Sequence, residues 1–252
     1  MAKEKVYFVS DLHLGSNLLE PPKATEKRFV RWLDTIREEA KALYLLGDIF
    51  DFWFEYKKTI PRGFTRFLGK IAEMHDSGVE IHFFTGNHDI WMFDYFQQEL
   101  GVTVHTQPLR TTIDGKIFYL AHGDGLGDDS RSFRLIRSLF HNRTCQMLFA
   151  HIPARWGIGF GHWWSRHNRK KDIARPIEYM GEDKEHLVLY SKKYIQEYPD
   201  TDYLIFGHRH ILLDLMLSRK NRMLIIGDWM QHFSCAVFDG KELTLEQYNA
   251  DL

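Results

Sequence analysis

The chain has 252 residues, of which 44% are hydrophobic, and a formal net charge of −1. This length accommodates one large domain or two small ones, and the near-neutral charge gives no overall indication of nucleic-acid binding. Cys145 and Cys235 lie far apart without a CxxC pair, which argues against a disulfide framework or a thiolate zinc site. Neither a signal peptide nor a run of about 18 apolar residues is evident, so we expect a cytoplasmic protein.

Apolar runs with strand character alternate with helical segments along the chain. The runs cover 5–11, 42–48, 80–87, 116–124, 202–208 and 222–228. Apolar residues recur at helical spacing within 24–41 and 62–78, which separate the first three runs. This alternation predicts βαβ units and a largely parallel sheet. The final segment, 234–249, predicts an antiparallel hairpin that turns at Asp239 and Gly240.

The segment 131–175 departs from this alternation. It carries ten Arg and Lys residues and one acidic residue, Asp172, which amounts to a local charge of +9. Phe133, Ile136 and Phe140 form a helical stripe, and further Phe and Trp residues follow. We interpret 126–180 as a helical lid inserted into a single domain of 1–252. The interleaved aromatic and basic residues favour a functional surface, with a solvated helical face or nucleic-acid binding as alternatives.

Five of the strand-like runs end in side chains that bind metal ions. Asp11 and His13 follow the first run, where residues i and i+2 of a strand share one face. In an open α/β sheet, ligands collect at the carboxyl ends of the strands. The candidate metal ligands are Asp11, His13, Asp48, Asn87, His122, His208 and His210. Carboxylate, amide and imidazole ligands without thiolate suit Mn, Fe or Zn.

Seven ligands exceed the needs of one catalytic ion. Asp48 can bridge two ions about 3.5–4 Å apart, which is the usual separation in two-metal sites. Such a pair activates a water molecule and clamps the oxygens of a phosphate during in-line attack. We therefore predict a binuclear centre that cleaves a phosphate ester or anhydride.

The ordered blocks DLHLG, GDIFD, GNHD, HGD and GHRH resemble the calcineurin-like metallophosphoesterase superfamily. The resemblance implies an α/β fold, a two-sheet β-sandwich flanked by helices. It also implies two groups of ligands that share Asp48. One group is Asp11, His13, Asp48 and His210, and the other is Asp48, Asn87, His122 and His208. Asp48, Asn87 and His88 are the implied catalytic residues, and His88 lies near the phosphate and protonates the leaving group.

GDIFDFW and the segment 122–171 are similar to the UDP-2,3-diacylglucosamine diphosphatase family of the lipid A pathway. This similarity implies manganese and cleavage of an acylated UDP-sugar into UMP and a diacylated glucosamine 1-phosphate. It also implies substrate contacts from Asn87, His88, Asp129, Ser165, Asn168, Lys171 and His208. Aromatic residues of the lid would take the acyl chains, and its basic residues would rest on the anionic inner membrane. We expect a peripheral location on the cytoplasmic face and no nucleic-acid partner.

The chain departs from that family at one position. Its best-known members carry Arg after the metal-binding Asn, whereas this chain has His88. Another nucleotide-linked sugar or a soluble phosphodiester therefore remains an alternative substrate, and a scaffold with a vestigial metal site is a further alternative. Asp228 is expected to be a turn residue. GIGFG, 157–161, lacks both a preceding strand and the GxGxxG spacing of a dinucleotide loop.

Overall fold

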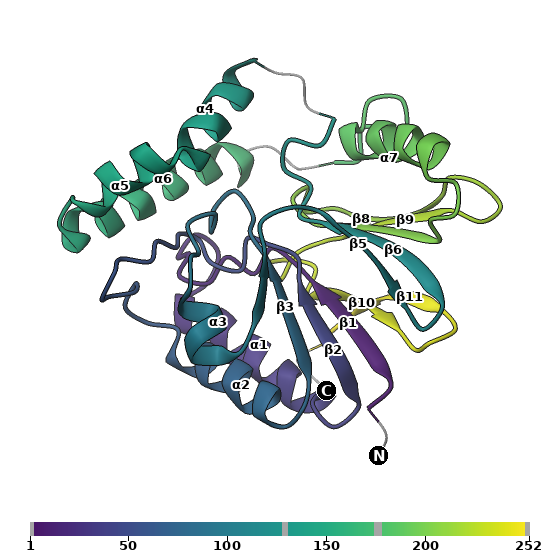
Figure 1. The fold of residues 1–252 in the computed structure, drawn as a ribbon, viewed down its shortest axis with the longest axis horizontal. Helices are drawn as coiled ribbons and strands as arrows, with labels where there is room; N and C mark the ends of the chain where they lie inside the picture. The colour runs from purple at the N-terminus through teal and green to yellow at the C-terminus, as the bar shows by residue number, and fades with distance from the viewer. Residues whose placement is uncertain (1–2, 128–130, 174–177, 250–252) are drawn as a thin grey trace.

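The computed structural model describes residues 3–127, 131–173 and 178–249; within these, the side chains of 131–134, 136 and 168–173 are not described. Two mixed sheets pack face to face in this structure (Figure 1). The predicted α/β sandwich flanked by helices is confirmed. All six predicted strand-like runs contain a strand, and the predicted hairpin forms between the last two strands.

The first sheet has the order β11-β10-β1-β2-β3-β4. Its strands β1, β2, β3 and β4 run parallel, whereas β10 pairs antiparallel with both β1 and β11. The strands are β1 (Lys5–Val9), β2 (Ala40–Leu45), β3 (Glu80–Phe84), β4 (Thr103–His105), β10 (Ser234–Phe238) and β11 (Leu243–Gln247).

The second sheet has the order β5-β6-β7-β9-β8, with parallel strands β6, β7 and β9 at its centre. The antiparallel edge strands β5 and β8 and the three-residue β4 were not anticipated from the sequence. The strands are β5 (Leu109–Ile113), β6 (Lys116–Ala121), β7 (Tyr203–Phe206), β8 (Leu212–Met216) and β9 (Arg222–Ile226).

Alternate residues of the central strands pack into two different cores, because successive side chains of a strand point to opposite faces. In β1, Val6 and Phe8 lie between the sheets, whereas Tyr7 and Val9 face the helices. The helices on that outer face are α1 (Pro22–Ile36), α2 (Thr65–Asp76) and α3 (Tyr95–Leu100) (Figure 1). α1 ends at Ile36 rather than at 41, because β2 already begins at Ala40. Helix α7 (His186–Glu197) covers the second sheet.

Three helices occupy the basic, aromatic segment and lie at one end of the sandwich (Figure 1). They are α4 (Arg131–His141), α5 (Arg143–Ala150) and α6 (Ala154–Ile173). They are attached by a small aromatic core, in which Phe140 and Phe149 pack on Phe54 and Trp91. The indole nitrogen of Trp91 also donates to the carbonyl of Phe140, 2.9 Å away. Within the described part of the chain, no helix is long and apolar enough to span a membrane.

Candidate metal centre

The seven predicted ligands lie in loops that follow the carboxyl ends of β1, β2, β3, β6 and β7. Loops of the first sheet carry Asp11, His13, Asp48 and Asn87, and loops of the second sheet carry His122, His208 and His210. The sandwich therefore brings the two sets of loops together at one end. This placement agrees with the rule that ligands collect at the carboxyl ends of parallel strands.

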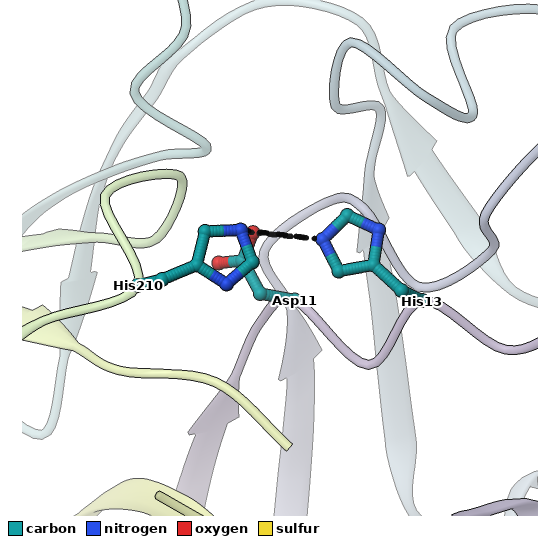
Figure 2. Close-up of side chains that lie close together, drawn as sticks. All are labelled: Asp11, His13 and His210. Atoms are coloured by element: carbon teal, nitrogen blue, oxygen red, sulfur yellow. Dashed lines mark hydrogen bonds and ion pairs between the residues drawn. The ribbon is translucent and has the colours of Figure 1, made fainter. Parts of the chain in front are cut away.

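Asp11, His13 and His210 form the first cluster (Figure 2). The Nε2 atoms of His13 and His210 are 3.3 Å apart, and Asp11 Oδ1 lies 3.3 Å from His210 Nε2. Figure 2 shows the two imidazole rings and the carboxylate turned toward one another. Three ligand atoms this close, from segments almost 200 residues apart, can surround one cation.

Asp48, His122 and His208 form the second cluster. His122 Nε2 lies 3.3 Å from Asp48 Oδ2, and the same carboxylate oxygen lies 3.9 Å from His13 Nε2 in the first cluster. Asp48 thus stands between the two clusters, which is the geometry that a bridging carboxylate requires.

Asp51 joins this region, although the sequence analysis did not propose it. Its carboxylate lies within 4.8 Å of ring nitrogens of His13 and His88. The available signal was the second acid of GDIFD, three residues after Asp48. Only the folded loop shows that both acids of this block face the centre.

The backbone of the ligand loops is strained. Within the described ranges, eight non-glycine residues have positive φ, and five of them are predicted ligands. These five are Asp11 (56°), His13 (47°), Asp48 (53°), His208 (66°) and His210 (50°). Each costs about 1–2 kcal/mol relative to ordinary backbone. Such strain persists where the surrounding structure and a bound ligand compensate for it, and functional sites are the common case.

The strand-spacing reason for pairing Asp11 with His13 was wrong, although the two residues do meet. Strand β1 ends at Val9, and both residues lie beyond it in the left-handed conformation. Their side chains converge because the backbone turns sharply at the end of the strand.

The electrostatics of the centre favour cations. Burial raises the pKa of Asp11, and the nearby imidazoles of His210 and His122 only partly oppose this effect. Burial acts on Asp48 in the same sense, but His122, His88 and His13 hold its pKa well below the usual range. Both carboxylates lie within 4 Å of His13 Nε2, and two buried carboxylates in one site are costly unless positive charge neutralises them.

Buried oxygen atoms without hydrogen bonds support the same conclusion. Among the described residues, Asp11 Oδ1 and Asn87 Oδ1 accept no hydrogen bond, although both atoms are buried. A buried acceptor without a donor costs about 1–3 kcal/mol. Divalent metal ions satisfy such oxygens together with imidazole nitrogens. The residues present therefore fit a pair of divalent ions.

Asp228 orients His210. Its Oδ2 lies 3.3 Å from His210 Nδ1 and 3.2 Å from His232 Nδ1, which leaves His210 Nε2 directed at the first cluster. Its Oδ1 accepts hydrogen bonds from the backbone of Met230 and Gln231, as expected of a turn residue. The prediction of a turn was thus correct but incomplete, because a carboxylate behind a ligating histidine fixes its tautomer and orientation.

Asp89, the last residue of GNHD, fastens two ligand loops to each other. Its buried carboxylate accepts hydrogen bonds from the backbone of Gly86 (2.7 Å), Ile49 (2.8 Å) and Phe50 (3.2 Å). Burial raises its pKa to about 7. These bonds hold the loop of Asp48 against that of Asn87.

The structure places some of the predicted substrate contacts and does not describe others. His88 and His208 belong to the side-chain groups of the centre, and Asn87 lines a cavity together with His88. Ser165 of α6 is buried, with its hydroxyl 3.1 Å from His88 Nδ1. Asn168 and Lys171 belong to α6, but their side chains are not described. Asp129 lies outside the described residues.

An apolar cavity of about 290 Å³ opens beside His88, beneath the inserted helices. Asn87 and His88 form its polar end, together with Asp51, Asp124 and Arg137. Aromatic side chains dominate the rest of its wall: Phe52, Trp91, Phe140, Phe149, Phe160 and Trp164. The metal centre is therefore continuous with a compartment suited to hydrocarbon.

Comparisons with known proteins identify the family. A calcineurin-like phosphoesterase model matches residues 4–212. The chain is 44% identical to a UDP-2,3-diacylglucosamine hydrolase of Porphyromonas gingivalis over 97% of both chains. It is 27% identical to one of Edwardsiella ictaluri over 94% of this chain and 90% of the relative. Among solved structures, the phosphoesterase Yfce from E. coli aligns with a TM-score of 0.46 at 15% identity, covering 96% of this chain and 92% of Yfce. This chain belongs to the calcineurin-like phosphoesterase family.

Proposed function

We propose that this protein hydrolyses the pyrophosphate bond of UDP-2,3-diacylglucosamine and releases UMP and 2,3-diacylglucosamine 1-phosphate. The observation that carries this proposal is the shared wall between the metal centre and the aromatic cavity, to which Asn87 and His88 contribute. A phosphate bound at the centre places a neighbouring acylated sugar at the mouth of this cavity. The similarity to two UDP-2,3-diacylglucosamine hydrolases supports the same substrate.

The aromatic cavity, which we call the acyl cavity, accounts for a lipid substrate. Each methylene that leaves water contributes about 0.8 kcal/mol, so acyl chains supply much of the binding free energy. Helices α4, α5 and α6 form part of its wall and act as a lid in this proposal, within a single domain of 1–252 whose lid spans 126–180. A chain-free UDP-sugar would leave this cavity unused and bind more weakly.

The seven ligands would hold two divalent ions, which we propose to be manganese. Asp11, His13, Asp48 and His210 would bind one ion, and Asp48, Asn87, His122 and His208 the other. When bound, the ions supply an activated water and positive charge for the phosphate oxygens. Asp48 can bridge the two ions because its carboxyl is held in the ionised form.

His88 is positioned to deliver a proton to the leaving group. Its backbone N–H donates to Asp48 Oδ1 (2.8 Å), which fixes the residue at the centre. Its Nδ1 lies 3.0 Å from the backbone carbonyl of Asp51. A carbonyl can only accept, so Nδ1 carries a proton; the imidazolium form would carry a second proton on Nε2, and this is the proton that would pass to the leaving group.

We also propose that the lid rests on an anionic membrane at its cytoplasmic face. Large apolar side chains protrude from α5 and α6, among them Trp156, Trp163 and Leu148, which are 73%, 58% and 66% exposed. The segment 131–175, which contains both helices, carries a charge of +9. Exposed aromatic groups beside basic residues bind the interface of anionic lipids. Co-sedimentation with anionic but not with zwitterionic vesicles, weakened by a Trp156→Ala/Trp163→Ala double variant, would support this location.

The test of the function uses protein that is stripped of metal and reloaded with Mn²⁺. UMP release is measured from UDP-2,3-diacylglucosamine, from a chain-free UDP-sugar and from a generic phosphodiester. We expect efficient turnover of the acylated substrate alone. Equal efficiency on the chain-free sugar would refute the role of the acyl cavity. Turnover of the generic ester alone would make the protein a phosphoesterase for soluble phosphodiesters, an alternative suggested by His88.

A further inference from the structure

A second cavity, of about 170 Å³, borders the metal centre. Its wall includes Gly15, Ser16, Asn17, Asp51, His162 and Arg166. This wall contrasts with that of the acyl cavity, because hydroxyl, amide, imidazole and guanidinium groups replace the aromatic rings. We call it the polar cavity.

Helix α6 separates the two cavities. Gly161, Trp164 and Ser165 line the acyl cavity, whereas His162 and Arg166 line the polar cavity. His162 and Arg166 are four residues apart, so they lie next to each other on one face of the helix. The T-shaped contact of His162 with Phe52 further fixes its ring.

The two cavities meet at Asp51, which lines both of them. The carboxylate of Asp51 lies within 4.8 Å of ring nitrogens of His13 and His88, so this junction is at the metal centre. Hydrolysis of a pyrophosphate divides its substrate into two halves that lie on opposite sides of the cleaved bond. A substrate with this bond at the centre can place one half in each cavity.

We infer that the polar cavity binds the nucleotide half of the substrate, a nucleoside 5′-monophosphate; this inference rests on the proposed function. The acylated half matches the apolar wall, which leaves the polar cavity for a group with a phosphate, a ribose and a base. Arg166 presents rigid donors that suit phosphate oxygens and the carbonyl oxygens of a pyrimidine. Ser16, Asn17 and His162 supply donors and acceptors of the kind that ribose hydroxyls and a base edge require.

The inference predicts opposite effects of substitutions on the two faces of α6. Loss of a charge-assisted hydrogen bond corresponds to about a tenfold to hundredfold change in affinity. We therefore expect Arg166→Ala to weaken UMP binding by at least about tenfold, with Arg166→Lys less affected. The acylated product should bind within about twofold of wild type in both variants. Trp164→Ala, the matched control on the other face, should weaken the acylated product and spare UMP.

The experiment measures calorimetric binding of UMP and of 2,3-diacylglucosamine 1-phosphate to Mn²⁺-loaded protein, with a thermal unfolding check of each variant. Wild-type affinity for UMP in both Arg166→Ala and His162→Ala would overturn the inference. Equal weakening of both products by Arg166→Ala would also overturn it, because the residue would then act on the whole site. Binding needs no turnover, so an Arg166-dependent UMP site in a protein that fails to hydrolyse the acylated substrate would sustain the inference and refute only the proposed function.

Discussion

The substitution Gly161→Ala provides a sharp test of how α6 packs beside the candidate metal centre. Gly161 lies in α6 where the helix passes Phe52, and a Cβ added there would approach three carbons of the Phe52 ring to less than 3.0 Å. Gly159, on the same helix, has no atom within 4 Å of an added Cβ. The GIGFG motif thus lies in a helix, and Gly161 permits close packing at this contact.

The magnitudes follow from this geometry. Carbon atoms in favourable contact are about 3.5–4.0 Å apart, so Gly161→Ala must separate α6 and the Phe52 ring by about 1 Å or more. Overpacking of this kind lowers the free energy of unfolding by about 1–3 kcal/mol. Replacing a helical glycine with alanine raises it by about 1 kcal/mol through the higher helix propensity of alanine. Gly159→Ala gains the same helix-propensity stabilisation without a steric clash. We expect Gly161→Ala to be about 1–3 kcal/mol less stable than Gly159→Ala.

Thermal unfolding and kinetics together test this reasoning. At this chain length, 1 kcal/mol corresponds to about 2–4 °C in the melting temperature. Phe52 and Gly161 both line the acyl cavity, so KM for the acylated substrate should rise in Gly161→Ala and stay unchanged in Gly159→Ala. The hydrolysis of a chain-free ester should be equal in both variants. Identical melting temperatures and KM values for the two alanine variants would refute the close packing of α6.

Three further outcomes follow from the centre and its surroundings. Asp48→Ala should abolish turnover and lower the metal content measured after gel filtration, since it removes the shared ligand; full activity would exclude a bridging role. Asp228→Asn should weaken metal affinity about 10–100-fold by freeing His210, whereas His232→Gln, which removes the other imidazole from the same carboxylate, should leave that affinity nearly unchanged. Burial lowers the pKa of His105 to about 4 from 6.5, so between these pH values the unfolded chain binds more protons than the folded chain. The free energy of unfolding therefore falls as the pH drops from about 6.5 toward 4. His105→Gln should therefore remove about 2 kcal/mol of the stability loss between pH 7 and 5 in urea unfolding, and an unchanged pH profile would contradict this.

The inserted helices contact residues at the candidate metal centre. Ser165 of α6 reaches the ring of His88, and Arg137 of α4 lies 3.5 Å from Asp124, which follows His122 in the HGD block. A change in how the helices are seated would therefore alter both the acyl cavity and the orientation of His88. In the proposed function, this coupling would give lipid binding a structural route to the position of His88.

The sequence by itself determined the fold class, the helical insertion and the identities of the seven candidate ligands. These features depend on local information, because strand and helix periodicity extends over a few residues and each ligand motif directly follows its strand. The rule that ligands gather at the carboxyl ends of strands then sufficed to predict that Asp11 and His210 meet. The short or edge strands β4, β5 and β8 escaped prediction because their apolar pattern is weak and their pairing partners define them.

Only the tertiary structure decided which residues support these ligands and where a substrate can lie. Asp51 and Asp228 acquire their roles from partners in distant segments, and the same is true of the two cavities on either side of α6. Such contacts depend on how loops and helices pack in three dimensions, which no local pattern encodes. The left-handed backbone of Asp11 and His13 illustrates the same limit, since sequence spacing predicted their proximity for a reason that the folded loop does not use.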